Sequence, residues 1–239
     1  MVYYPKIRNP LYLKYYVKKI QQIKKANSLG KLIDFTFVNK NIIDFLFLGK
    51  GMIYTKQVKS EILQLLEYLK EKNIKYLLEI GTAGGGSLFL FSQVAQKNAI
   101  LISLDLPYYS YGDSYPKWKK RLYKFCIKPD QNLFLIRADS HKKKTLNKVK
   151  QILGENKLDF LFIDGDHTYK GAEQDFQMYA PLVRNKGIIA FHDIVEVPGN
   201  EVDVNKFWNE IKQYYENREF VENWKQKKCG IGIITKINK

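Results

Sequence analysis

The sequence predicts a doubly wound α/β fold, in which helices cover both faces of a mostly parallel β-sheet. Short apolar runs alternate with helical stretches from residue 55 onward, which is the pattern of parallel strands joined by crossover helices. A glycine-rich turn follows the first run, and acidic residues follow the later ones. Open sheets of this class bind ligands beyond the carboxyl ends of their strands. We therefore expect a Rossmann-like, three-layer α/β/α architecture with a ligand site at that edge.

The first part of the chain predicts a helical extension over residues 1–50, followed by the main domain at 51–239. Leu11–Ile23 carries apolar residues at mixed helical spacing, and Phe35–Phe47 is strongly apolar, which predicts burial. This basic, aromatic extension packs on the domain, covers a site as a lid, or forms a dimer contact. Packing is the default interpretation.

The domain opens with an amphipathic helix over Val58–Lys70, which places Ile62, Leu65 and Leu69 on one face. The predicted strands are Tyr76–Ile80, Ile100–Leu104, Leu133–Ile136, Phe160–Ile163 and Gly187–Phe191. The predicted helices between and after them are Ser87–Ala95, Trp118–Phe125, His141–Leu153, Lys170–Leu182 and Val204–Tyr215. Gly230–Thr235 predicts a last strand.

Composition narrows the class of protein. A chain of 239 residues with 45% apolar residues suits one globular domain plus an extension. No apolar run approaches the roughly 20 residues that span a bilayer, and Met1–Pro10 lacks the apolar stretch of a signal peptide. We therefore expect a cytoplasmic protein, in which Cys126 and Cys229 are buried or incidental thiols rather than a disulfide.

The formal net charge is +16. Such a charge can attract nucleic acid or an anionic surface. The basic residues are scattered through a composition rich in Lys, Ile, Asn and Tyr, and no nucleic-acid-binding motif accompanies them. A nucleic-acid partner is disfavoured, although the charge keeps it open.

The glycine-rich turn lies in Leu77–Ser87, between a predicted strand and a predicted helix. Its backbone N–H groups and the helix N-terminus would face a ligand. Glu79 ends the strand and separates two interpretations, because a dinucleotide pyrophosphate disfavours a nearby carboxylate. A cationic ligand such as S-adenosylmethionine (SAM), with an ammonium and a sulfonium, tolerates or favours one.

Two further carboxylates follow the next strands. Asp105 lies about 20 residues beyond Gly85, where an acidic residue accepts the ribose hydroxyls of a nucleoside; capping a turn before Pro107 is the structural alternative. Asp139 either contacts an adenine amino group or caps the helix over His141–Leu153. Ser140 alone could supply that cap.

A second polar group follows the apolar run at residues 158–163. Asp164, Asp166 and His167 come directly after it, and His192-Asp193 ends the next predicted strand. Adjacent parallel strands lie about 4.8 Å apart, so Asp164, His192 and Asp193 can converge on one point. Clustered carboxylates are costly unless a cation or a metal pairs with them.

Taken together, these motifs resemble class I SAM-dependent methyltransferases. Glu79, Gly81 and Gly85 match the first motif of that class, with Ala83 at a position that is often glycine. The runs at 164–169, 179–183 and 187–193 look like the cephalosporin hydroxylase-like and macrolide-sugar O-methyltransferase group. The resemblance covers residues 55–235 and implies that Gly230–Thr235 is an antiparallel closing strand.

The resemblance also implies roles for individual residues. His167 falls on the position of a general base. Asp164, His192 and Asp193 fall on the positions that hold a divalent metal, Mg²⁺ or Mn²⁺; His192 departs from the pattern, because that position is usually a carboxylate and imidazole is a poorer ligand for Mg²⁺. The residues implied to bind SAM are Glu79, Gly81, Thr82, Gly85, Ser87, Asp105, Asp139 and Asp164.

The expected function is therefore a SAM-dependent O-methyltransferase. Its acceptor is a hydroxylated small molecule, with a carbohydrate favoured by the resemblance alone, and a homo-oligomer is possible. The alternatives are a SAM-binding protein of the same fold without catalysis and a nucleic-acid methyltransferase. An NAD-dependent dehydrogenase explains neither Glu79 nor the residues around Asp164.

Overall fold

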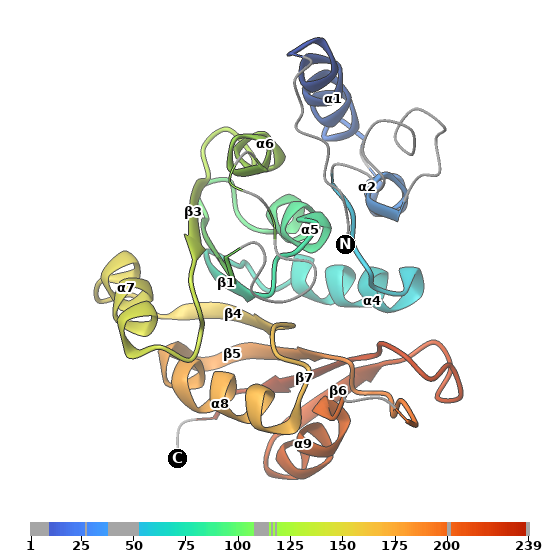
Figure 1. The fold of residues 1–239 in the computed structure, drawn as a ribbon, viewed down its shortest axis with the longest axis vertical. Helices are drawn as coiled ribbons and strands as arrows, with labels where there is room; N and C mark the ends of the chain where they lie inside the picture. The colour runs from blue at the N-terminus through green and yellow to red at the C-terminus, as the bar shows by residue number, and fades with distance from the viewer. Residues whose placement is uncertain are drawn as a thin grey trace.

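The computed structural model describes residues 10–26, 28–37, 53–107, 115, 117, 119–199 and 202–237. Its centre is a seven-stranded sheet of order β3-β2-β1-β4-β5-β7-β6 (Figure 1). Strands β1 to β5 pair in parallel, and β7 runs antiparallel to both β5 and β6. The strands are β1 (Tyr76–Ile80), β2 (Ile100–Asp105), β3 (Asn132–Arg137), β4 (Leu158–Ile163), β5 (Val183–His192), β6 (Glu216–Phe220) and β7 (Ile231–Thr235). The predicted fold class is confirmed.

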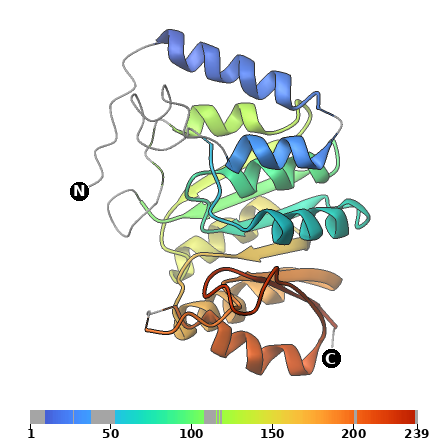
Figure 2. The same cartoon turned by 90° about the vertical axis from the view of Figure 1, so that its right-hand side faces the viewer.

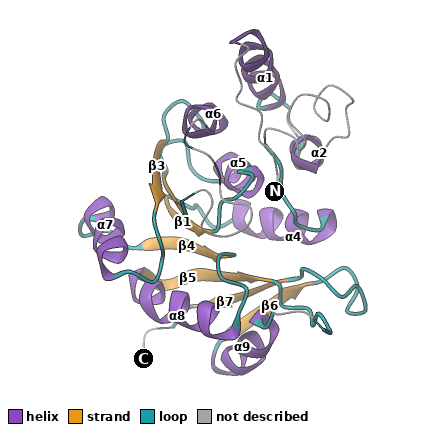
Figure 3. Ribbon diagram, viewed as in Figure 1, coloured by secondary structure: helices purple, strands orange, loops and turns teal. Residues whose placement is uncertain are grey.

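Helices cover both faces of this sheet (Figure 3). The helices of one face are α4 (Lys59–Lys70), α5 (Gly86–Val94) and α6 (Lys119–Cys126). Those of the other face are α7 (Lys143–Leu153), α8 (Tyr169–Tyr179) and α9 (Val204–Ile211). Short 3-10 turns follow α8 (Ala180–Leu182) and α9 (Lys212–Tyr214). None of the helices in the described part of the chain combines the length and the apolar character needed to cross a membrane.

Alternation along the central strands builds two cores. Leu77 and Phe160 face the cluster under α4 and α5, whereas Leu78 and Leu161 face the cluster under α8 and α9. Successive side chains of a strand point to opposite faces, so a strand buried on both faces is apolar throughout. This explains why β1 and β4 read as continuous apolar runs.

The N-terminal helices form an outer layer on the α5–α6 face (Figure 2). They are α1 (Pro10–Ile23) and α2 (Leu29–Phe37). The Tyr16 ring lies 5.8 Å from that of Phe35, which lies 5.5 Å from that of Phe89 in α5. The extension thus shares the core of the main domain. The predicted boundary at residues 50 and 51, and the apolar residues 38–47, lie outside the described residues.

The sequence prediction was incomplete at several elements. Strand β6 was not predicted, because Glu216–Phe220 is polar and mostly exposed at the sheet edge. Helix α2 was seen only as an apolar segment. Helix α7 begins at Lys143 rather than His141, and α8 ends at Tyr179, before the 3-10 turn that carries Pro181.

Candidate active site

The glycine turn after β1 is shaped by close backbone contacts. Gly81 has φ +90° and Gly85 has φ +77°, a region that glycine enters without steric cost. A Cβ added to Gly81 would lie 1.9 Å from the Asp164 carbonyl oxygen. The turn therefore lies directly against the end of β4, and β1 and β4 present their polar residues to one space.

A strap formed by residues 53–57 crosses the same turn. The Gly86 N–H donates to the Tyr54 carbonyl at 2.9 Å, and Tyr54 pairs with Gly85 in a parallel bridge. A Cβ on Gly84 or Gly86 would fall within 2.5 Å of Tyr54 backbone atoms. These two glycines thus admit the strap, a role that the motif alone does not reveal.

Glu79 lies beneath this turn and is completely buried. Neither carboxylate oxygen has a hydrogen-bond partner among the residues that the structure describes. Burial raises the pKa of Glu79 to about 8, against the lowering effect of the Ser87 and Thr82 hydroxyls, which lie near the carboxyl without the geometry of a hydrogen bond. A buried carboxyl without a partner costs free energy, and a cationic ligand above it would satisfy it.

Asp105, at the end of β2, contacts the turn directly. Its Oδ2 accepts the Ala83 N–H at 2.7 Å, and its Oδ1 accepts the Leu106 N–H at 2.8 Å. Burial raises the pKa of Asp105 to about 6, although these two N–H donors oppose the shift. Each oxygen keeps a second lone pair, so the carboxylate can hold the turn and still accept a hydroxyl. Next to it, the Thr82 and Ser103 hydroxyls lie 2.6 Å apart.

Asp139 follows β3, one strand farther out. Its Oδ1 accepts the His141 N–H at 2.9 Å, which orders the turn before α7. The N-cap of α7 is Lys142, without a side-chain hydrogen bond. Neither Asp139 nor Ser140 caps this helix, so the structural alternative stated for them is wrong. Contact of Asp139 with adenine stays a prediction.

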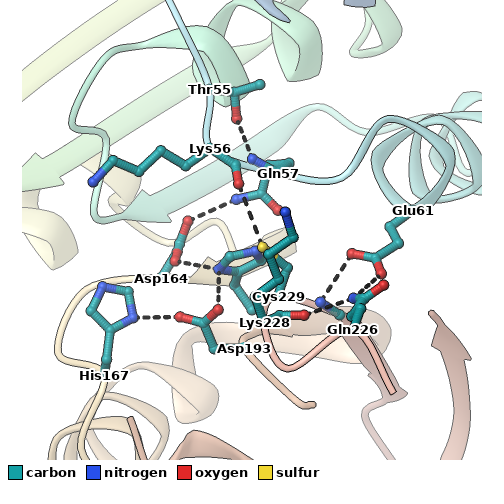
Figure 4. A network of polar contacts seen from close by, with 12 residues as sticks. Thr55, Lys56, Gln57, Glu61, Asp164, His167, Asp193, Gln226, Lys228 and Cys229 are labelled. Carbon is teal, nitrogen blue, oxygen red and sulfur yellow. Dashed lines mark hydrogen bonds and ion pairs between the residues drawn. The ribbon is translucent and has the colours of Figure 1, made fainter. Parts of the chain in front are cut away.

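The polar residues that follow β4 and end β5 lie close together, as expected for neighbouring parallel strands (Figure 4). His192 Nδ1 lies 3.0 Å from Asp164 Oδ1 and 3.2 Å from Asp193 Oδ1, and His167 Nδ1 lies 2.7 Å from Asp193 Oδ2. Gln57 of the strap donates from Nε2 to Asp164 Oδ2 at 3.0 Å. The four predicted residues therefore form one cluster at the ends of β4 and β5.

The electrostatics of the cluster favour charged imidazoles. Burial disfavours the imidazolium of His192, but Asp164 and Asp193 outweigh it and raise the pKa of His192 well above its usual value. The hydrogen bond to Asp193 raises the pKa of His167. Burial opposes ionisation of Asp193, yet His192 and His167 lower its pKa. Asp193 also has φ +62°, a strained conformation that occurs often at functional sites.

The donor set of this cluster fits a divalent ion. One ligand atom from each of Asp164, His167 and Asp193 lies within 4.8 Å of the others. His192 is 5% exposed, and its Nε2 has no hydrogen-bond partner among the described residues. Two carboxylates with imidazoles suit ions such as Mn²⁺ or Zn²⁺ better than Mg²⁺, which prefers an all-oxygen shell.

Two residues of the site were missed as site residues by the sequence analysis. Gln57 lies just before the helix predicted over Val58–Lys70 and was not given a role. Cys229 was treated as incidental, but its Sγ belongs to a group with ligand atoms of His192 and Asp193 that all lie within 4.8 Å of one another. The register of β5 and β7 pairs His192 with Ile231, so the residues just before Ile231 must lie near the end of β5. The prediction that both cysteines are buried and not disulfide-bonded is confirmed.

The central part of the chain, just under half of its length, is similar to one known family. Residues 78–194 match a family model described as a methyltransferase domain. This segment runs from β1 through β5 and includes each predicted site residue. This match agrees with the predicted resemblance to class I SAM-dependent methyltransferases.

Curated relatives add no named activity. An uncharacterised protein of Acanthamoeba polyphaga mimivirus is 36% identical over 139 residues, which cover 58% of this chain and 60% of that protein. An uncharacterised protein of Sinorhizobium fredii is 24% identical over 136 residues, or 56% of this chain and 15% of that protein. The chain thus spans less than two thirds of either relative.

Solved structures share the fold at low identity. An O-methyltransferase from Bacillus cereus in complex with SAH aligns with a TM-score of 0.57 at 14% identity, covering 93% of this chain and 91% of that one. The O-methyltransferase TomG from Streptomyces achromogenes, in complex with SAM, aligns with a TM-score of 0.52 at 15% identity, covering 94% and 96%. The chain therefore has the fold of known O-methyltransferases.

Proposed function

We propose that this chain, which carries a methyltransferase domain of class I fold, transfers the methyl group of SAM to a hydroxyl of a small molecule. The observation that carries the proposal is the unpartnered, buried carboxyl of Glu79, which lies beside the cluster of Asp164, His167, His192 and Asp193. The Glu79 carboxyl suits a cationic cofactor, and the cluster suits the acceptor.

The cofactor half of the site is built around the glycine turn. Gly81 and Gly85 allow the backbone to approach a ligand closely, and Thr82 and Ser87 line the same turn. Glu79 would receive the positive charge of SAM, and Asp105 would accept its ribose hydroxyls. The structures of similar fold that hold SAH or SAM support this cofactor.

His167 is the proposed base on the acceptor side. Its Nδ1 bonds to Asp193, which directs Nε2 away from Asp193, and its side chain is 48% exposed, so an acceptor can reach it. The bond to Asp193 also stabilises the imidazolium that forms when His167 takes the hydroxyl proton. A hydroxyl oxygen held here would attack the methyl carbon in line with the departing sulfur.

The energetics explain why a metal is part of the proposal. An aliphatic hydroxyl has a pKa of about 15.7, near that of water, whereas histidine has a pKa of about 6.5. This difference in pKa means that full transfer of the proton to histidine costs roughly 12 kcal/mol. A divalent ion held by Asp164, His192 and Asp193 would lower the pKa of the hydroxyl as a Lewis acid. A sugar acceptor follows from the family resemblance alone.

Calorimetric titration of SAM tests the cofactor assignment. We expect the wild-type protein and Glu155→Gln, a surface control, to bind SAM equally. We expect Glu79→Gln to bind at least about tenfold more weakly, because the change removes about 1.4 kcal/mol or more of charge interaction. Absence of SAM binding in the wild-type protein would overturn the proposal.

Transfer of labelled methyl groups to a panel of sugars, glycosides and phenols tests the reaction. We expect a methyl ether product, and Asp164→Asn to turn over at least about 100-fold more slowly. Unchanged turnover in this variant, with the fold intact, would contradict the assignment. SAM binding without transfer to any acceptor would favour the alternative of a non-catalytic binding protein. The imidazolium of His192 between two carboxylates is compatible with that alternative, because it neutralises them without a metal.

A further inference from the structure

The loop between β6 and β7 brings Cys229 to the acceptor side of the site. Ligand atoms of Cys229, His192 and Asp193 lie within 4.8 Å of one another. Cys229 is 8% exposed, and its Sγ is directed at the Lys56 carbonyl at 3.5 Å. Figure 4 shows the sulfur joined to Lys56 of the strap, close to the cluster that holds Asp193. The thiol thus lies inside the polar cluster and not in an apolar core.

Several contacts hold the loop in this position. Val195 N–H donates to the Cys229 carbonyl at 3.0 Å. The buried carboxylate of Glu61 in α4 accepts the Gly230 N–H at 2.9 Å and the Gln226 side chain at 2.7 Å. Cys229 itself has φ +57°, which costs of order 1–2 kcal/mol in a residue with a Cβ. Contacts with Val195 and with Glu61 in α4 hold this strained backbone in place, and the direction of the thiol is therefore fixed.

His192 gives the independent indication of a ligand. It is 5% exposed, and its Nε2 has no hydrogen-bond partner among the described residues. Nδ1 lies near two carboxylates. Buried imidazole nitrogens normally have a hydrogen-bond partner. A buried ring whose Nε2 has none, and which lies next to a thiol and a carboxylate, is arranged as metal ligands are.

We propose that Cys229, His192 and Asp193 bind one thiophilic divalent ion, of the class of Zn²⁺ or Co²⁺, through sulfur, nitrogen and oxygen. Bonds of about 2.3 Å to sulfur and 2.0–2.2 Å to nitrogen and oxygen put tetrahedral ligand atoms about 3.3–3.6 Å apart. Since the three atoms lie within 4.8 Å of one another, they need to approach by about 1.5 Å at most. On binding, the Cys229 thiol and the His192 imidazolium each lose a proton to solvent, so that a metal–sulfur bond replaces the S–H bond and a metal–nitrogen bond replaces an N–H bond.

This inference rests on the proposed function for the position of the site and narrows the choice of metal. Thiolate and imidazole ligands select transition-type ions, whereas Mg²⁺ is held by carboxylates, carbonyls and water. The matched family pattern implied Mg²⁺ or Mn²⁺; the donors of this chain point to a softer ion. The fourth coordination position of the ion would be left for an oxygen of the acceptor or of Asp164.

Cobalt titration of the reduced, metal-free full chain tests the site by its optical spectrum. We expect an intense near-ultraviolet charge-transfer band from a cobalt–thiolate bond, together with visible bands of tetrahedral Co²⁺. Cys229→Ser should lose the charge-transfer band, and Cys126→Ser, which alters the other buried thiol, should retain it. Excess Zn²⁺ should abolish the spectrum, and the same excess of Mg²⁺ should not.

Three results would overturn the inference: no charge-transfer band in the wild-type protein, persistence of the band in Cys229→Ser, or displacement of cobalt by Mg²⁺. Visible bands without the charge-transfer band would overturn it while leaving a metal at Asp164, His192 and Asp193. X-ray absorption at the zinc edge of the wild-type protein needs no variant, and should find one sulfur at about 2.3 Å. SAM binding, measured separately, tests the proposed function independently of these outcomes.

Discussion

At the scale of single residues, the bond between His167 and Asp193 decides how the chain responds to pH. The pKa of His167 is raised above its usual value by this bond, although burial opposes the shift. A base must be neutral to accept a proton. We therefore expect kcat/KM to rise with pH, through a pKa above 6.5, as His167 loses its proton.

Replacement of this histidine checks the assignment. His167→Gln should lower kcat by about 100-fold or more and remove the rising limb of the pH profile. His141→Gln is the matched control, because His141 also has a raised pKa but owes it to Asp175, in α8. A limb that persists in His167→Gln, or one that disappears in His141→Gln, would contradict the role of His167.

The residue scale also shows what the sequence can and cannot reveal. Asp164, His192 and Asp193 were expected to converge because they end neighbouring parallel strands, and the structure brings them together. Gln57 and Cys229 were missed as site residues because their positions depend on a strap and a loop. No periodicity predicts where such segments cross a sheet edge.

At the scale of elements, the contact between the β1 turn and the end of β4 limits what residue 81 can be. An alanine there would have φ +90° and a Cβ 1.9 Å from the Asp164 carbonyl. We expect Gly81→Ala to lower the free energy of unfolding by about 3 kcal/mol or more, from backbone strain and overlap combined. Urea denaturation measures this loss.

Gly30→Ala provides the comparison for that variant. Gly30 lies in helix α2, and the nearest atom to an added Cβ is the Ser28 hydroxyl at 3.6 Å. Alanine should stabilise this position by about 0.5–1 kcal/mol. If Gly81→Ala and Gly30→Ala change the free energy of unfolding equally, the glycine turn can move to accept a side chain. The close approach of residue 81 to the Asp164 carbonyl would then not constrain the site.

Element boundaries were predictable where packing and local pattern agree. Strand β1 has the bounds expected from its apolar run, because it is buried against both helix layers. Strand β6 was not predictable, since its exposed residues carry no alternating pattern and its pairing with β7 comes from the tertiary fold. The start of α7 was displaced because the Asp139 side chain orders a turn before it.

At the scale of the whole molecule, helix α1 belongs to the same core as the sheet. Ile20 is completely buried in the cluster that also holds Leu88 and Phe160. Ile20→Ala should therefore destabilise the entire protein by about 2–4 kcal/mol. Circular dichroism and tryptophan fluorescence should report one coincident transition.

Gln22→Ala, on the exposed side of the same helix, should change stability by less than about 0.5 kcal/mol. If Ile20→Ala instead produces a separate early transition, the N-terminal helices form an independent unit. That result would support the division into an N-terminal extension and a main domain that the sequence predicted. Packing of the extension on the domain would then contribute little to the stability of the domain.

The strand order has a consequence for how such a chain can diversify. Strands β3, β2 and β1 carry the residues assigned to the cofactor, and β4, β5 and β7 bring those assigned to the acceptor, so the two sets meet only at the β1–β4 seam. Apart from Gln57 of the strap and Asp164, which is assigned to both sets, the sets come from separate stretches of the gene, before residue 140 and after residue 158. A descendant can therefore exchange its acceptor by recombination or drift in the second stretch, while the cofactor half is inherited intact.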